Sequence, residues 1–221
     1  MRCTFGIISC PDTCHNLGSV IDSIHKYSPV DYEIIMIGGS IPNLTSTVNL
    51  THIPFDESQK KSWITKKKNI ITDLARYENI VYMHDYVELM PGWKDGFDDL
   101  EPWDVCMSRI FTQEGKRFRD WAAWDDPQFP GSGRIVEKWC PPEGIPMAGR
   151  MTIVPYDYTN TQYMYISGAY WVAKKQFMQE HPLNEDLSWG EGEDVEWSYR
   201  ARKTWRYKMN IHSRVRFNKP K

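Results

Sequence analysis

The chain lacks the long apolar runs and the excess of one charge that would assign it to a class at once. None of its apolar runs approaches the roughly 18 residues that span a bilayer. Its N-terminus enters a strand pattern directly, without the apolar stretch and cleavage site of a signal peptide. Lysine and arginine (27) nearly balance aspartate and glutamate (29), so there is no bulk positive charge for nucleic acid. We therefore expect no transmembrane segment and no nucleic-acid partner.

Cysteine is scarce, and no two cysteines have the CxxC spacing of a zinc or redox site. An odd number of thiols argues against a disulfide framework. We expect reduced cysteines in a cytoplasmic protein, either in a bacterium or in the host cytosol of a virus. The five cysteines are Cys3, Cys10, Cys14, Cys106 and Cys140.

Aromatic residues, in contrast, are abundant, with ten tryptophans and twelve tyrosines among 221 residues. A chain of this length can bury a sizeable core in one domain. Aromatic side chains fill such cores, but they also form platforms for sugar rings or bases, because they offer an apolar face with a polar tip.

The spacing of apolar residues predicts alternating strands and helices. This alternation is typical of an α/β protein with a mostly parallel, doubly wound sheet. Regularity fails from about residue 110 to 157, which indicates a functional excursion. Strands are predicted over residues 4–9, 33–37, 51–54, 80–83, 104–108, 163–167 and 205–211, and helices over 16–27, 62–77, 174–180 and 193–203.

One strand ends on an acid. Residues 80–83 are apolar and β-branched or aromatic, as in a strand that is buried on both faces, and Asp85 follows them. Open α/β sheets bind their ligands at the carboxyl ends of their strands, and a buried carboxylate is costly unless it meets a cation. Asp85 is therefore a candidate ligand-binding residue. The alternative is that it caps a turn after a core strand.

Three segments occur in an order that resembles the GT-A glycosyltransferases of the family-2-like group. Met83–Glu88 resembles their acidic metal motif. Residues 166–171, with Gly168, resemble the glycine loop that approaches the donor. Residues 189–197 resemble the segment that supplies the base in inverting members. His212 follows where this fold often places a metal-binding histidine.

The resemblance covers most of the chain and excludes its irregular middle. It implies a GT-A (Rossmann-like) catalytic domain over residues 1–221, with a nucleotide-sugar-binding half (1–108) and an acceptor-side half (109–221) that contains the irregular insertion. It further implies an inverting glycosyltransferase, which moves a sugar from a nucleotide-diphosphate donor, with a UDP-sugar favoured, to the hydroxyl of a glycan or other acceptor. The chain could also be one domain of a longer protein.

A divalent cation is expected at this site, because it would neutralise the diphosphate that leaves the sugar. The resemblance makes Asp85 and His212 its protein ligands, and a histidine would favour Mn²⁺ over Mg²⁺. The motif departs from the usual Asp-x-Asp, since Tyr86 and Val87 follow Asp85. If the strand continues, Glu88 points to the opposite face.

Asp194 is the candidate general base. It would take the proton from the acceptor hydroxyl as that oxygen attacks the anomeric carbon. Glycines at 190 and 192 leave the backbone free to approach substrate. The alternative is helix capping, since acids are common at helix N-termini.

Further donor-binding residues are expected from the same resemblance. Ser9 would lie near the nucleoside, and Gly38 and Gly39 stand where the family often has an acid, although they could simply form a turn. Lys68 is the candidate from the lysine run 66–68. Three consecutive helical residues point to different faces, so some of this run is solvated.

The acceptor side is predicted from composition and motif context. Trp121 and Trp124 are possible sugar platforms, and Trp189 and Glu193 flank the predicted base.

Two other functions are alternatives to transfer of a sugar. A carbohydrate-binding module would bind glycans without nucleotide or metal, but it leaves the ordered acidic motifs unexplained. A sugar nucleotidyltransferase usually has a glycine-rich, basic loop after the first strand, and residues 9–13 contain no basic residue.

Overall fold

The computed structural model describes residues 1–10, 16–29, 31–41, 44–129, 134–136, 149–187 and 190–218, with the backbone alone for 134–136 and 149. No helix within these ranges is both long enough and apolar enough to cross a membrane.

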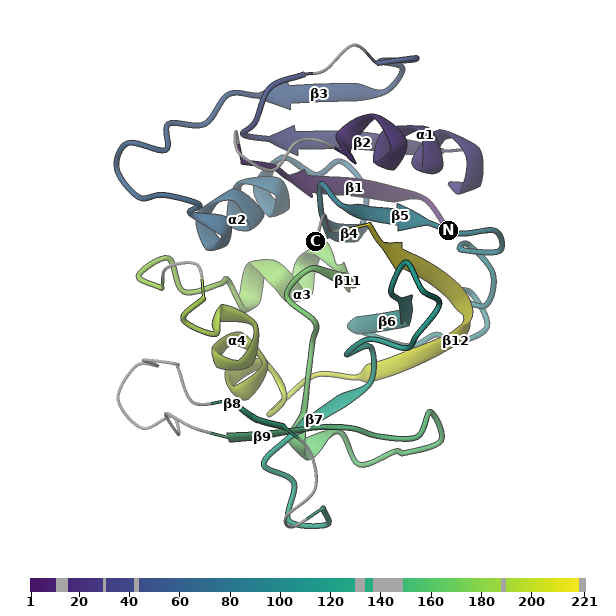
Figure 1. Ribbon diagram of the computed structural model, residues 1–221, viewed down its shortest axis with the longest axis vertical. Helices are drawn as coiled ribbons and strands as arrows, with labels where there is room; N and C mark the ends of the chain where they lie inside the picture. The colour runs from purple at the N-terminus through teal and green to yellow at the C-terminus, as the bar shows by residue number, and fades with distance from the viewer. Residues whose placement is uncertain are drawn as a thin grey trace.

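An eight-stranded sheet runs through the molecule (Figure 1). Its first four strands are parallel and have the order β3-β2-β1-β4. The chain moves outward from β1 and then returns past it, so right-handed crossovers place α1 and α2 on opposite faces. The predicted doubly wound arrangement is confirmed. These elements are β1 (Cys3–Ile8), α1 (Leu17–Tyr27), β2 (Tyr32–Ile37), β3 (Leu50–Ile53), α2 (Ile64–Leu74) and β4 (Asn79–His84).

The sheet continues from β4 in the order β11-β6-β12-β5. β6 and β12 are parallel to each other, whereas β11 pairs antiparallel with β4 and β6, and β5 antiparallel with β12. The prediction of a mostly parallel sheet is confirmed. The elements are β5 (Val87–Leu89), β6 (Val105–Phe111), β11 (Tyr170–Lys174), α3 (Lys175–Glu180), α4 (Glu193–Ala201) and β12 (Tyr207–Phe217).

Sequence analysis missed β5 and β11. β11 leads into α3 without a turn, so no turn residues in the sequence mark where the strand ends and the helix begins. It is nevertheless central, since Tyr170 pairs with Met83 and Lys174 with Asn79 of β4. The division at residue 108/109 falls inside β6, and β11 and β12 return to the large sheet, so this sheet takes strands from both sides of the division.

The stretch predicted to be irregular contains strands of a second sheet. This sheet is antiparallel and has the order β10-β7-β9-β8. Its strands have two to five residues, too few to show a period in the sequence. They are β7 (Ala122–Trp124), β8 (Arg134–Val136), β9 (Gly149–Ile153) and β10 (Met164–Tyr165), the last preceded by the 3₁₀ turn η2 (Thr161–Tyr163).

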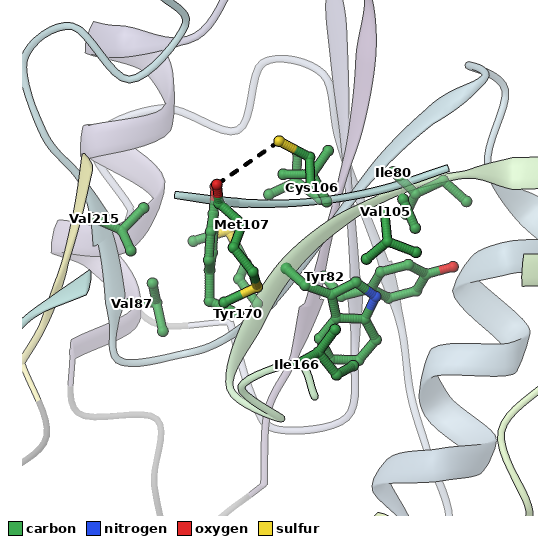
Figure 2. Close-up of a cluster of buried hydrophobic side chains, with 14 of the residues drawn as sticks. Ile80, Tyr82, Val87, Val105, Cys106, Met107, Ile166, Tyr170 and Val215 are labelled. Atoms are coloured by element: carbon green, nitrogen blue, oxygen red, sulfur yellow. Dashed lines mark hydrogen bonds between the residues drawn. The ribbon is translucent and has the colours of Figure 1, made fainter. Parts of the chain in front are cut away.

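The main core extends along the large sheet, from β1, β2 and α1 to β4, β11, β6, β12 and β5. Figure 2 shows side chains from the last five of these strands packed together, and all of those labelled in it are buried. Trp93, Trp103, Trp171 and Trp197 are also buried, each at most 1% exposed. Many of the aromatic residues therefore build the core and offer no surface to a sugar.

The carboxyl ends of β1 and β4 meet at the point where the strand order reverses. Ile8 is in register with His84, so Ser9 and Asp85 follow neighbouring strands. Ligands of open α/β sheets bind at such a reversal, and the fold thereby positions the predicted motif residues.

Candidate active site

Asp85 is buried at the reversal point and bonds to Ser9. Its side chain is 1% exposed, and the Ser9 hydroxyl donates to Asp85 Oδ2 at 2.6 Å. β4 ends at His84 and a turn follows, so the condition under which Glu88 would point to the opposite face of the same strand is not met. Glu88 instead lies on β5, where its carboxylate accepts from Arg216 Nη2 at 2.7 Å. The structure thus places one acid of the motif, Asp85, at this edge of the sheet.

Gly38 and Gly39 form a left-handed turn against Ser9. Their φ angles are +78° and +63°, in the region that favours glycine. A Cβ at Gly38 would lie 2.4 Å from the Ser9 carbonyl oxygen, and one at Gly39 would lie 2.5 Å from Ser9 Oγ. The turn therefore gives the backbone of β2 a close approach to Ser9, for which no larger residue leaves space.

The lysine run on α2 is not a solvated face. Lys67 and Lys68 are 0% and 1% exposed. Lys67 Nζ donates to the Ser9 carbonyl at 2.8 Å and pairs with Glu57. Lys68 Nζ donates to the Gly168 carbonyl at 2.9 Å and lies over the Trp171 ring. Two buried ammonium groups thus hold the loops that follow β1 and precede β11.

Gly168 joins the glycine loop to the start of α4. Its N–H donates to Asp194 Oδ2 at 3.0 Å, and the Val195 N–H donates to Asp194 Oδ1 at 2.9 Å. The second bond reaches an N–H of the first turn of α4, although Asp194 is not the N-cap residue, which is Gly192. The first bond ties the carboxylate to the glycine loop before β11, which capping does not explain.

Glu193, which was expected on the acceptor side, lies beside Lys68 and Gly168. Its carboxylate lies 3.8 Å from Lys68 Nζ, and a Cβ on Gly168 would lie 3.0 Å from Glu193 Oε1. Burial, and then the charge of Asp194, raise the pKa of Glu193 to about 7. Burial lowers the pKa of Lys68, and the two acids oppose that shift.

Arg119 is a site residue that sequence analysis did not find. Its φ of +27° is unusual for a residue other than glycine, and its Nε is buried without a hydrogen-bond partner among the residues described. Burial and the charge of Asp85 raise the pKa of Tyr86, whereas Arg119 lowers it, and Glu193 and Asp194 also act on this hydroxyl. The charges of both the strand-end acid and the α4 acids therefore reach the Tyr86 hydroxyl. Arg119 stands in the aperiodic stretch, where nothing but a local density of charge marked it.

His212 is not brought to Asp85. It is exposed at the bulge of β12, and its side chain packs on Gly96. Phe217, five residues later on β12, pairs with Val87 of the acidic motif. At about 3.3 Å per residue, His212 therefore lies on the order of 10 Å or more away from this pair along β12.

The described residues contain no group of three or more His, Cys, Asp or Glu side chains arranged to hold a metal. Asp85 by itself still suits a hard cation, since Mg²⁺ is commonly bound through one or two carboxylates together with substrate phosphates and water. A single-carboxylate site at Asp85 therefore fits a cation shared with a donor diphosphate.

The predicted aromatic platforms have different environments. Trp121 is 2% exposed, and its indole packs on Tyr207 and donates to the Tyr158 carbonyl, so it offers no face to a sugar. Trp124 is also buried but lines a small cavity beside α4. Trp189 lies outside the described residues.

No protein-family model matches the sequence, and no curated protein sequence matches it. Solved structures match its fold. Residues 1–349 of TarS from S. aureus superimpose with a TM-score of 0.64 at 11% identity, over 99% of this chain and 60% of that one. A longer S. aureus TarS structure gives 0.62 at 12% identity, over 99% and 37%. GalNAc-T7, in a structure with UDP, GalNAc and Mn²⁺, gives 0.65 at 14% identity, over 98% and 43%.

The strand order and these superpositions define the class of fold. The chain has the GT-A fold of the glycosyltransferases, as its motif order predicted. It spans between 37% and 60% of the length of the proteins that it matches.

Proposed function

We propose that this chain is an inverting glycosyltransferase that transfers a sugar from a nucleotide-diphosphate donor to the hydroxyl of a glycan. The observation that carries the proposal is the contact between Asp194 and the Gly168 N–H, at the edge of the sheet where Asp85 also lies. A candidate base is thereby held next to the loop expected to approach the donor. A UDP-sugar is favoured, with support from the GalNAc-T7 structure, which contains UDP and GalNAc.

Each charged group has a separate role in this proposal. Asp194 would take the acceptor proton through the lone pairs that its two backbone contacts leave free. Arg119, whose Nε has no partner among the described residues, would bind the diphosphate oxygens, since guanidinium groups suit such anions. Lys68 would hold the Gly168 loop in place. Trp124 stays the proposed sugar platform, while the burial of Trp121 removes it from this role.

The cation belongs to the same proposal. Asp85 would hold it, and when bound it would neutralise charge on the leaving diphosphate. The GalNAc-T7 structure contains Mn²⁺, which supports a divalent ion. The preference for Mn²⁺ over Mg²⁺ no longer has a nitrogen ligand behind it, because His212 lies elsewhere.

A cytoplasmic location also stays a proposal. The buried thiols of Cys3 and Cys106 form no disulfide, which supports a reducing compartment.

The Asp194→Asn variant tests the assignment of the base. We expect folding and donor binding to be kept while kcat falls about 100-fold or more, since general bases contribute 10²–10⁴. Transfer from UDP-sugars is measured by release of UDP, and binding by thermal shift. The matched control is Asp99→Asn, an exposed acid remote from the site. Near wild-type turnover in Asp194→Asn would show that Asp194 is not the base. If no nucleotide sugar gives a thermal shift, the proposal of a nucleotide-sugar donor is wrong.

A further inference from the structure

Two adjoining cavities run along α4 and share three residues. The first, of about 180 Å³, is lined mainly by apolar surface, including Trp124, Tyr165 and Val195. The second, of about 700 Å³, is lined by polar groups, including Gln162 and Lys203. The two cavities adjoin at these boundary residues, and we call the two together the α4 groove. The shared residues are Tyr163, Tyr199 and Arg202.

The apolar end of the α4 groove adjoins the catalytic acids. Val195 follows Asp194 directly at the start of α4. Tyr165, which lines the same cavity, has a hydroxyl on which the charges of Arg119 and Asp194 both act. Trp124 packs against Tyr165 with a centroid distance of 6.0 Å. A ligand seated here would have a neighbouring hydroxyl next to Asp194.

The far end of the groove carries a cation for which the described residues supply no carboxylate partner. The Arg202 guanidinium lies over the rings of Tyr199, at 4.5 Å, and Tyr163, at 5.8 Å. No carboxylate among the described residues pairs with it, whereas Arg117, Arg200, Arg206 and Arg216 each pair with one. Burial lowers the pKa of Arg202, as is expected for a partly desolvated cation without a counter-ion.

Lys203 adds a second positive charge at the same end, with its Nζ 5.7 Å from the centre of the Tyr199 ring. The distance from Val195 to Arg202 is seven helical residues, or about 10 Å at 1.5 Å per residue. A ligand that reaches both ends is therefore longer than one sugar ring.

We propose that the α4 groove binds an anionic oligosaccharide, the acceptor of the reaction proposed above. Its sugar rings would pack on Tyr199 and on the part of Trp124 that lines the small cavity. A carboxylate, sulfate or phosphate on a more distant unit would bind Arg202 and Lys203. Charge complementarity selects this occupant, because a neutral glycan leaves the Arg202 cation without a partner. That the oligosaccharide is the acceptor rests on the proposed function, whereas its binding to the groove does not.

Binding of defined trisaccharides tests this proposal without turnover. The probes are trigalacturonate, a sulfated or phosphorylated maltotriose, and neutral maltotriose, each titrated calorimetrically into the full chain at low and high salt. We expect an anionic trimer to bind about tenfold or more tightly than the neutral one, with affinity that falls as salt rises. The first two probes distinguish a carboxylate from a sulfate or phosphate as the preferred anion.

Arg202→Gln and Lys203→Gln should each abolish most of this preference, whereas the control Lys208→Gln, an exposed lysine on β12, should leave it unchanged. Equal affinity for neutral and anionic trimers, or an unchanged preference in both groove variants, would overturn the inference. Asp194→Asn should bind the anionic trimer as the wild type does. If UDP-sugars shift the melting temperature and no anionic trimer binds, this inference fails while the donor proposal stands. If an anionic trimer binds and no UDP-sugar shifts the melting temperature, the donor proposal fails while binding to the groove stands.

Discussion

Gly168 lies where the lysine of α2 and the two acids of α4 come together. A Cβ there would lie 2.9 Å from Asp194 Oδ2 and 3.0 Å from Glu193 Oε1. Its amide binds one of these acids and its carbonyl binds Lys68. One residue without a side chain therefore positions both α4 acids and the buried lysine.

Gly168→Ala should displace Asp194 from the reacting geometry while the fold is kept. We expect kcat/KM to fall about tenfold or more, since small misplacements of catalytic groups are costly. Steady-state kinetics and a melting curve measure the two effects. The control is Gly18→Ala on α1, where a Cβ meets nothing within 4 Å. In a helix this change should stabilise the protein by about 0.5–1 kcal/mol, with activity unchanged. Equal activity in both variants would contradict the positioning role.

Glu193→Gln should change how stability depends on pH. The folded protein keeps a proton on Glu193 up to about pH 7, whereas the ordinary value is 4.5. Between these values the native state binds more protons than the unfolded state, so the free energy of unfolding falls as pH rises. The variant lacks this titration, and its stability should fall less across the window. Urea denaturation near pH 5 and near pH 7.5 measures the difference, and parallel curves for both proteins would count against it.

Two elements bring the lysines and the glycine loop together. α2 directs Lys68 and Thr72 at the sheet, where Thr72 bonds to the Tyr82 hydroxyl at 2.7 Å. β11 places Trp171 beside Tyr82, with the rings stacked at 4.7 Å. The Lys68 ammonium lies over Trp171, so one face of α2 is matched to one face of β11.

Lys68→Met tests this match. It keeps the length and apolar stem of the side chain but removes the bond to the Gly168 carbonyl and the charge beside Glu193. We expect kcat/KM to fall about tenfold or more, and the pKa of Glu193 to rise further because its cation is gone. Lys66→Met is the control, since Lys66 lies over Trp63, outside this contact. Activity is read from UDP release, and a similar loss in both variants would show a general effect on α2.

The molecule as a whole separates the two residues that were expected to hold the cation. Asp85 lies at the reversal of strand order, whereas His212 lies at the bulge of β12 against Gly96. The long strand β12 reaches the site with its last residues and not with its bulge.

Binding of a donor should therefore depend on Asp85 and not on His212. A UDP-sugar with Mg²⁺ or Mn²⁺ at 100 times its Kd should raise the free energy of unfolding by about 2.7 kcal/mol. We expect Asp85→Asn to lose the part of the thermal shift that depends on the cation, and His212→Ala to keep it. If His212→Ala also loses the cation-dependent part of the thermal shift, this histidine is a metal ligand after all.

Local patterns were enough for the order of strands and helices from β1 to β4, for Asp85 at a strand end and for Asp194 at a helix start. Short-range periodicity and turn residues carry this information, because neighbours in the sequence remain neighbours in a helix or strand. The same patterns could not show that β11 enters the sheet antiparallel, since strand pairing joins segments far apart in the chain. Nor could they show the burial of Lys67 and Lys68, which depends on the partner that covers each face of α2.

The sequence was enough to show that the chain forms an α/β sheet with an acid at the end of β4. Both features depend on the local spacing of apolar residues. The tertiary structure alone placed Arg119 beside the acids, turned Glu193 toward Lys68, kept His212 away from Asp85 and opened the α4 groove. These features depend on contacts between residues that are distant in the chain, and such contacts exist only after the strands have paired and the helices have packed.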